Sequence, residues 1–151
     1  MQFSHGFEVD QTPAQVWMFT SDVPSLLDCI PGVKSVACLG QELYQAVISE
    51  RVGPFKVEFH IDAEVSCPEP GRLLKAVGGG KDAVLGSTVQ IKIAVSLSEM
   101  PSGATHVDVN AELTVFGKLA TLGFGVMQHK ARENMNGFAA NMKRHLEEGL
   151  A

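Results

Sequence analysis

Apolar and polar residues alternate along most of the middle of the chain, and this pattern predicts a run of β-strands. The clearest case is the segment 56–67, where apolar residues from Val57 to Cys67 occupy every second position and polar residues lie between them. A strict two-residue period places one side of a strand against a core and the other in water. The same reasoning predicts strands, some of them weaker, over residues 3–9, 33–39, 43–52, 72–78, 89–97 and 105–115.

Near the N-terminus the pattern changes and predicts two short helices. The segment Thr12-Pro13-Ala14-Gln15 has the sequence of a capping box, with proline at the first helical position. Asp22 is expected to cap a second short helix, which must end near Pro31-Gly32.

At the C-terminal end the apolar spacing becomes three or four residues, which predicts a long helix over about 118–149. It would be about 45 Å long, and its glycines, Gly123 among them, are points where it can bend. An antiparallel sheet with one buried face needs a cover, and only this helix is long enough to provide it. We therefore predict an α+β helix-grip fold, in which a curved antiparallel sheet of about seven strands wraps around the long helix.

Such a sheet cannot touch one helix along its whole width, so we expect a cavity between them. The methionines of the helix are adaptable residues suited to apolar pockets. A pocket of this kind would hold a long apolar molecule with few polar anchors. The residues that we expect to line it are His5, Trp17, Tyr44, Phe59, Ile61, Ile93, Leu113, Phe124, Met127, Met135 and Phe138.

The length and net charge of the chain indicate a single domain and argue against some classes of partner. A chain of 151 residues is expected to form one domain over 1–151. The net charge of −5 and the scattered basic residues argue against nucleic acid as a partner. No apolar run approaches the ~18 residues that cross a bilayer, so we expect a cytoplasmic protein with at most peripheral contact with the inner face of the cell membrane.

The side chains that usually carry chemistry form no recognisable site. Three cysteines without a C-x-x-C pair suggest neither a disulfide framework nor zinc, and the five histidines show no metal-binding spacing. Nothing near Cys29 would activate it as a nucleophile, so we interpret Cys29, Cys38 and Cys67 as packing residues. We expect no catalytic residues, no metal and no cofactor beyond a bound lipid or quinone.

Two further segments contain residue types that are found in chemical sites. Gly78-Gly79-Gly80-Lys81 lacks the spacing of a phosphate-binding loop, and we expect a mobile loop there. His5 shares the inward parity of its strand with Phe3 and Phe7. We interpret it as a core or rim histidine, and as the residue to meet a polar ligand head if one enters the cavity.

The order of elements, together with several motifs, resembles the SRPBCC superfamily (START-like or Bet v 1-like). Within it, the sequence is similar to the CoxG family, which is named after the G-subunit of carbon monoxide dehydrogenase. The motifs that carry the resemblance are G-F-E-V (6–9), P-A-Q-V-W (13–17), D-C-I-P-G-V (28–33), R-V-G-P-F (51–55) and F-G-K-L-A-T-L-G (116–123).

The resemblance implies an accessory protein of a molybdenum hydroxylase of carbon monoxide dehydrogenase type, one that aids its maturation or its recruitment to the membrane. It also implies a hydrophobic ligand in the central cavity, with a lipid or a quinone as the natural candidate. Two alternatives stay open. One is a small cyclase or dehydratase acting on an apolar substrate, with His5 and Tyr44 as the inward acid–base candidates. The other is a structural adaptor with a filled core.

Overall fold

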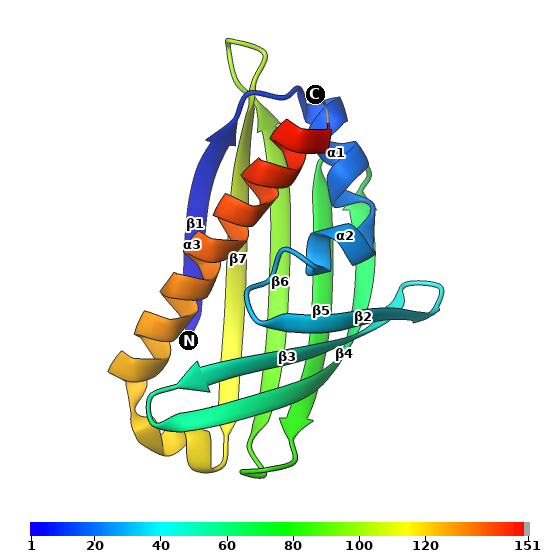
Figure 1. Ribbon diagram of the computed structural model, residues 1–151. Coiled ribbons are helices and arrows are strands. Elements are labelled where there is room, and N and C mark those ends of the chain that lie inside the picture. Colours follow the sequence, from blue (N-terminus) through cyan, green and yellow to red (C-terminus); the bar gives the residue numbers. More distant parts are fainter. Residues whose placement is uncertain (150–151) are drawn as a thin grey trace.

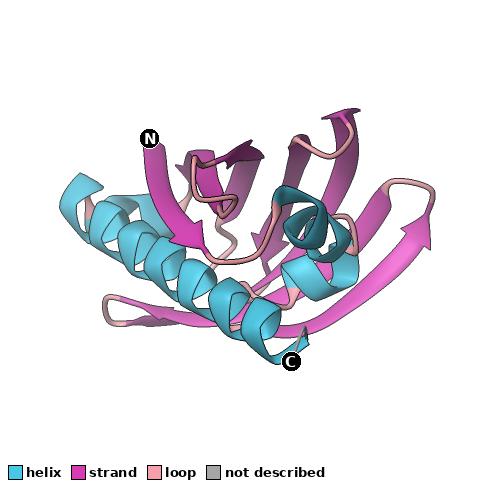
Figure 2. Ribbon diagram, turned by 90° about the horizontal axis from the view of Figure 1, so that it is seen from above, coloured by secondary structure: helices cyan, strands magenta, loops and turns pink. Residues whose placement is uncertain are grey.

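The computed structural model describes residues 1–149 and has the predicted α+β architecture: one curved sheet and a long C-terminal helix (Figures 1 and 2). Its elements, in chain order, are β1 (Gln2–Val9), α1 (Pro13–Thr20), α2 (Val23–Leu27), β2 (Val33–Gly40), β3 (Leu43–Val52), β4 (Phe55–Glu69), β5 (Leu73–Asp82), β6 (Thr88–Glu99), β7 (Thr105–Phe116), the 3-10 helix η1 (Lys118–Leu122) and α3 (Phe124–Gly149).

All seven strands form one antiparallel sheet in the order β1-β7-β6-β5-β4-β3-β2. Every strand except β1 therefore lies beside its neighbour in sequence, as expected for a meander. Figure 1 shows β2 and β3 running across the direction of β5–β7, so the sheet curls around the diagonal helix α3. In Figure 2, seen from above, α3 crosses the hollow of this curved sheet. The predicted helix-grip fold is confirmed.

The N-terminal helices begin where the sequence predicts. Thr12 Oγ1 accepts a hydrogen bond from Gln15 N at 3.3 Å, and Gln15 Oε1 accepts one from Thr12 N at 3.0 Å, so the capping box is present. Asp22 lies at the N-cap position of α2, as predicted, but its side chain does not cap the helix. Its carboxylate accepts the Ser25 hydroxyl at 2.7 Å, and it makes no side-chain hydrogen bond to the backbone of α2.

The long C-terminal helix is divided near its start. Residues 118–122 form η1, and Gly123 then has a φ of +91°, which other residues rarely adopt. The α-helix α3 begins only at Phe124 and is about 39 Å long at 1.5 Å per residue. In place of the expected bend within one helix, the chain forms two separate helices, the 3-10 helix η1 and the α-helix α3.

The triple glycine lies within β5, so the prediction of a mobile loop there is wrong. Gly78, Gly79 and Gly80 pair with both β4 and β6. A Cβ on Gly78 would lie 2.5 Å from the Asp62 carbonyl oxygen, and one on Gly80 would overlap the His60 carbonyl. Glycine is used at these positions because the backbone of β4 approaches too closely for any side chain.

Asp82 ends β5 as a fully buried carboxylate. Its oxygens accept the backbone N–H groups of Leu85 at 2.7 Å and Glu58 at 3.2 Å. Burial alone would raise the pKa of Asp82, but these hydrogen bonds and one from Val84 outweigh it and lower the pKa below its ordinary value of 3.8. Asp82 thereby ties β4 to the turn between β5 and β6.

Two separate hydrophobic clusters hold α3 on the sheet. The larger cluster joins α1 and α2 to the C-terminal half of α3 through Ala139, Met142 and Leu146. The smaller cluster lies at the other end of the helix, around Met127 and Leu119. No residue of α3 between Met127 and Ala139 is fully buried, which shows that the middle of the helix does not rest on a closed core.

Candidate functional site

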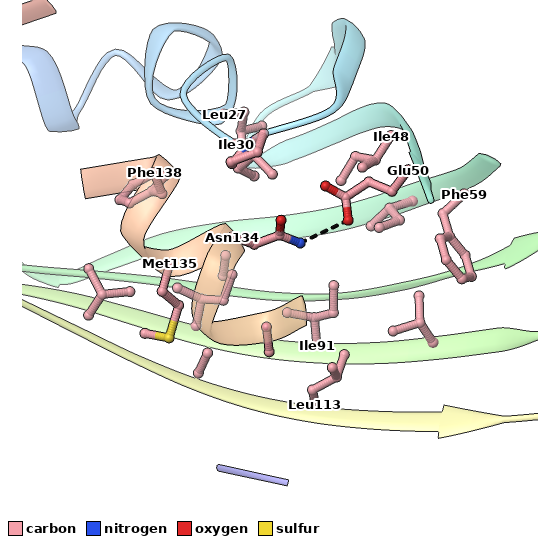
Figure 3. Close-up of a pocket in the computed structure, with 18 of the residues that line it drawn as sticks. Leu27, Ile30, Ile48, Glu50, Phe59, Ile91, Leu113, Asn134, Met135 and Phe138 are labelled. Carbon is pink, nitrogen blue, oxygen red and sulfur yellow. Dashed lines mark hydrogen bonds between the residues drawn. The ribbon is translucent and has the colours of Figure 1, made fainter. Parts of the chain in front are cut away.

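A cavity of about 250 Å³ lies opposite this middle section of α3, between the helix and the concave face of the sheet. Its volume is just below the range of about 300–1,000 Å³ that is common for small-molecule sites. Strands β3 to β7 form its floor, while α3 closes one side and α2 with the turn after it closes the other (Figure 3). Leu119 of η1 also lines the cavity.

The wall of the cavity is apolar almost throughout. Of the 29 residues that line it, only Glu50, Lys130 and Asn134 carry polar side chains. The apolar character follows from the strand period, because the inward-facing residues of β4, β6 and β7 are valine, isoleucine, leucine, phenylalanine and alanine. Such a surface can bind an apolar molecule by excluding water, and it offers few groups to fix its orientation.

The segment after α2 closes the cavity from the side, and it contains the Cys-Ile-Pro-Gly motif. Pro31 lines the cavity and packs against α3, where a Cβ on Gly137 would lie only 2.7 Å from Pro31 Cγ. Asn141 of α3 donates a hydrogen bond to the Cys29 carbonyl oxygen at 2.9 Å. The Gly32 carbonyl oxygen accepts the backbone N–H of Ser49 in β3 at 2.8 Å, so the motif joins α3 to β3 beside the cavity.

Cys29 itself is a packing residue with no exposed surface, as predicted. Its burial, supported by the neighbouring Asp28 carboxylate, raises the pKa of the thiol to about 12. The thiol is thus protonated at neutral pH and donates to the Ser25 carbonyl oxygen at 3.5 Å. A nucleophilic role would need the thiolate.

The prediction that Cys38 and Cys67 are packing residues is wrong, since both are exposed. Cys67 lies where the pairing of β4 with β5 shifts between Ser66 and Glu69. The alternation of buried and exposed side chains ends at this irregularity. Within residues 1–149, no group of three or more potential metal-ligating side chains is present.

Seven of the residues expected to line the cavity lie on its wall: Phe59, Ile61, Ile93, Leu113, Met127, Met135 and Phe138. The other four, His5, Trp17, Tyr44 and Phe124, are not among its lining residues.

These four residues lie at three different places in the fold. Trp17 and Tyr44 pack against the larger hydrophobic cluster and do not line the cavity. His5 faces inward on the edge strand β1, with its ring 6.0 Å from that of Phe7. Phe124 is 61% exposed, because α3 begins at this residue. The acid–base pair that the enzyme alternative requires, His5 and Tyr44, is therefore not in the cavity.

Sequence reasoning missed the polar residues of the site, of which Glu50 is the most informative. Its side chain is 11% exposed and lies on the inward face of β3, next to Ile48 and Val52. Asn134 Nδ2 donates to Glu50 Oε2 at 2.9 Å (Figure 3), and Lys130 Nζ lies 3.8 Å from the same oxygen. Burial raises the pKa of Glu50, while the Asn134 hydrogen bond and the Lys130 ammonium group oppose this change.

The signal that could have revealed Glu50 is its parity. It shares the inward positions of its strand with Tyr44, Ala46, Ile48 and Val52. The alternation in β3 is weak because its outward positions also carry apolar residues such as Leu43 and Val47. The sequence pattern therefore did not mark which face of β3 was buried.

Comparison with known proteins places this architecture among described families. The sequence profile of the carbon monoxide dehydrogenase G-subunit family, CoxG, matches residues 6–147. A comparison with curated protein sequences finds no significant match. No helix among the described residues is long and apolar enough to span a membrane.

Solved structures with the same fold cover nearly the whole chain. A conserved protein from Geobacillus kaustophilus is 20% identical with a TM-score of 0.88, and the match covers 98% of this chain and 96% of that one. The Zhui aromatase/cyclase from Streptomyces sp. R1128 is 12% identical with a TM-score of 0.74, covering 100% and 96%. A START superfamily protein from Mycobacterium smegmatis is 12% identical with a TM-score of 0.73, covering 97% of both chains. At these identities the likeness concerns the fold alone.

Proposed function

Because the chain belongs to the CoxG family of carbon monoxide dehydrogenase, we propose that it is a non-catalytic accessory protein that binds a hydrophobic molecule, a lipid or a quinone. The observation that carries this proposal is the cavity of about 250 Å³ whose wall is apolar at all but three positions. An apolar molecule that enters it removes apolar surface from water, which is worth about 25 cal/mol per Å².

The second part of the proposal concerns the partner. Membership of the family supports a role beside a molybdenum hydroxylase of carbon monoxide dehydrogenase type, either in its maturation or in its recruitment to the membrane. Such an enzyme must pass its electrons to a respiratory carrier, so a cavity protein that holds a quinone or a lipid beside it would serve that need.

Ligand binding can be tested by native mass spectrometry of the protein after mild extraction, followed by titration of the emptied protein with quinones, their reduced hydroquinones, lipid alcohols and fatty acids. A matched pair of variants places the ligand. Ala131→Trp fills the cavity from α3, whereas Ala140→Trp adds the same side chain at an exposed position of the same helix. We expect binding to be lost in Ala131→Trp and retained in Ala140→Trp. Failure of the wild-type protein to bind any of these molecules would contradict the proposal.

The same titration tests the enzyme alternative, because a carrier returns its ligand unchanged. Conversion of the bound molecule would favour a cyclase or dehydratase. The partner is tested separately by co-expression with the components of a molybdenum hydroxylase. We expect the two proteins to co-purify, or the hydroxylase to change in its maturation or its membrane association. If none of these three effects occurred, the proposed partnership would be contradicted.

A further inference from the structure

The cavity has one polar corner, which Glu50 of β3 forms with Asn134 of α3 (Figure 3) and with Lys130 of the same helix. Burial of a carboxylate in an apolar wall costs free energy of folding unless its partners satisfy it. An apolar residue at this position would continue the surface of Ile48 and Val52 without that cost. Stability of the sheet alone therefore does not explain why a carboxylate occupies position 50.

Both polar contacts that the protein makes with the carboxylate involve the same oxygen. Asn134 Nδ2 lies 2.9 Å and Lys130 Nζ 3.8 Å from Oε2. Among residues 1–149, no hydrogen bond is made to Glu50 Oε1 or to Asn134 Oδ1. No side-chain nitrogen or oxygen of the described residues is both sealed from solvent and unpaired, so these two acceptors open onto accessible space. The polar corner thus presents hydrogen-bond acceptors that have capacity to spare.

The carboxylate is also held in place by its surroundings. Gly32 packs on its aliphatic stem, where a Cβ would lie 2.8 Å from Glu50 Cγ. The Gly32 carbonyl in turn accepts the backbone N–H of Ser49 at 2.8 Å. With Asn134 fixing Oε2 from the opposite side, the carboxylate has little freedom to turn away. A group held in this way can discriminate between ligands, since binding need not order it first.

We infer that Glu50 determines the specificity of the cavity: it selects apolar molecules whose polar head carries a hydroxyl group that can donate a hydrogen bond to its free oxygen. The inference rests on the proposed function and narrows it: among lipids and quinones it favours those with a hydroxyl head, such as a lipid alcohol or the reduced hydroquinone, over the oxidised quinone and the ionised fatty acid, which have no proton to donate. The hydroxyl head lies at the polar corner, and the apolar body extends toward Ile91, Leu113 and Met135 (Figure 3).

The physical basis is the cost of leaving the free oxygen without a donor. A hydroxyl group that donates to a carboxylate forms a charge-assisted hydrogen bond, which is roughly twice as strong as a neutral one. A methyl ether of the same molecule has no proton to donate, and its methyl group would displace water from the carboxylate without replacing the hydrogen bond. Sites built in this way discriminate strongly against the analogue that lacks the hydrogen-bonding group.

The test uses two probes that differ only at the head, para-hexylphenol and its methyl ether para-hexylanisole, in competition with a fluorescent apolar dye. For the wild-type protein we expect the phenol to bind at least about tenfold more tightly than the ether. Glu50→Gln keeps the shape but removes the charge, and should reduce this preference to a few-fold. Glu50→Met should abolish it while the ether still binds. Glu64→Gln, on the exposed face of β4, is the control and should retain the full preference.

The outcomes separate the two proposals. Equal affinity of wild-type protein for phenol and ether, or a preference unchanged in both Glu50 variants, would overturn the role of Glu50 and leave the binding function intact. In that case Glu50 only ties β3 to α3, which a loss of thermal stability without a change in preference would reveal. Failure of both probes to displace the dye from the wild-type cavity would overturn the binding of small apolar molecules itself, and this inference with it.

Discussion

Two methionines of α3 offer a direct test of whether the space between helix and sheet is open. Met135 and Met142 lie seven residues apart, so they are on the same side of the helix. Met142 is fully buried in the larger cluster, whereas Met135 is only partly buried and lines the cavity. Replacement by alanine changes helix propensity equally at both positions. The difference between the two variants therefore reports what each side chain touches.

We expect Met142→Ala to lower the free energy of unfolding by about 3–4 kcal/mol, within the range of about 2–5 kcal/mol for such changes in closed cores. The replaced side chain loses all of its burial and leaves a new void. Met135→Ala should cost only about 1–1.5 kcal/mol, because Met135 is less buried and one side of it already borders empty space. The change enlarges an existing cavity instead of opening a tightly packed region.

Urea denaturation at pH 7 measures both losses, with equal slopes in the two variants as the sign that only stability has changed. The protein must first be freed of bound apolar molecules, since a ligand touching Met135 would add its own stabilisation. The expected difference of about 2 kcal/mol corresponds to about 4–8 °C in Tm for a chain of this size. Equal losses in the two variants would refute the reasoning, because Met135 would then be packed as tightly as Met142.

Three further predictions concern the frame around the cavity. Asp82→Asn removes a carboxylate that accepts backbone hydrogen bonds and should cost about 2 kcal/mol in urea denaturation at neutral pH. Because the pKa of Asp82 is lowered on folding, the stabilisation by its carboxylate is complete above the ordinary pKa of 3.8 and is lost as the pH falls through the lower folded pKa. If the difference in unfolding free energy between variant and wild type did not narrow at acid pH, this reasoning would be contradicted. Gly80→Ala should cost at least about 2 kcal/mol through its overlap with β4, whereas Gly40→Ala, which has open space, serves as the control, and equal Tm values for the two would speak against close strand approach. Titration with a thiol reagent should modify two cysteines of the native protein and the third, Cys29, only after denaturation; rapid reaction of all three would show that Cys29 is not sealed.

The strands could be predicted from the sequence wherever one face is buried and the other is exposed to solvent, because apolar and polar residues then alternate with a period of two. The period over 56–67 and 105–115 marks β4 and β7 to within a few residues. It failed at the triple glycine of β5, since a glycine that serves close backbone approach has the same sequence signal as one that makes a turn. Only the position of β4 in the folded protein shows which of the two applies.

The cavity wall was predictable in part, for a related reason. Parity shows which face of a strand points inward, and this brought Phe59 and Leu113 correctly to the cavity. Parity does not show which part of a strand borders the cavity, and Tyr44 packs against the larger cluster without lining the cavity. Gly123, with its positive φ, separates η1 from α3. Because α3 starts directly after Gly123, Phe124 lies in the first turn of the helix and is exposed.

The open space itself depends on how α3 is held, and the Cys-Ile-Pro-Gly motif has a central part in this. An apolar cavity loses dispersion contacts along its walls, so the helix would move inward unless rigid contacts kept it in place. Pro31 meets α3 at Gly137, and Asn141 binds the Cys29 carbonyl oxygen. At the other end of the motif, the Gly32 carbonyl oxygen accepts a hydrogen bond from the backbone N–H of Ser49 in β3, and Gly32 packs beside Glu50. The motif thus sets the spacing between α3 and β3 at the polar corner. A change in its packing would alter cavity width and carboxylate position together, which makes this short segment a determinant of ligand choice even though its own cysteine carries no chemistry.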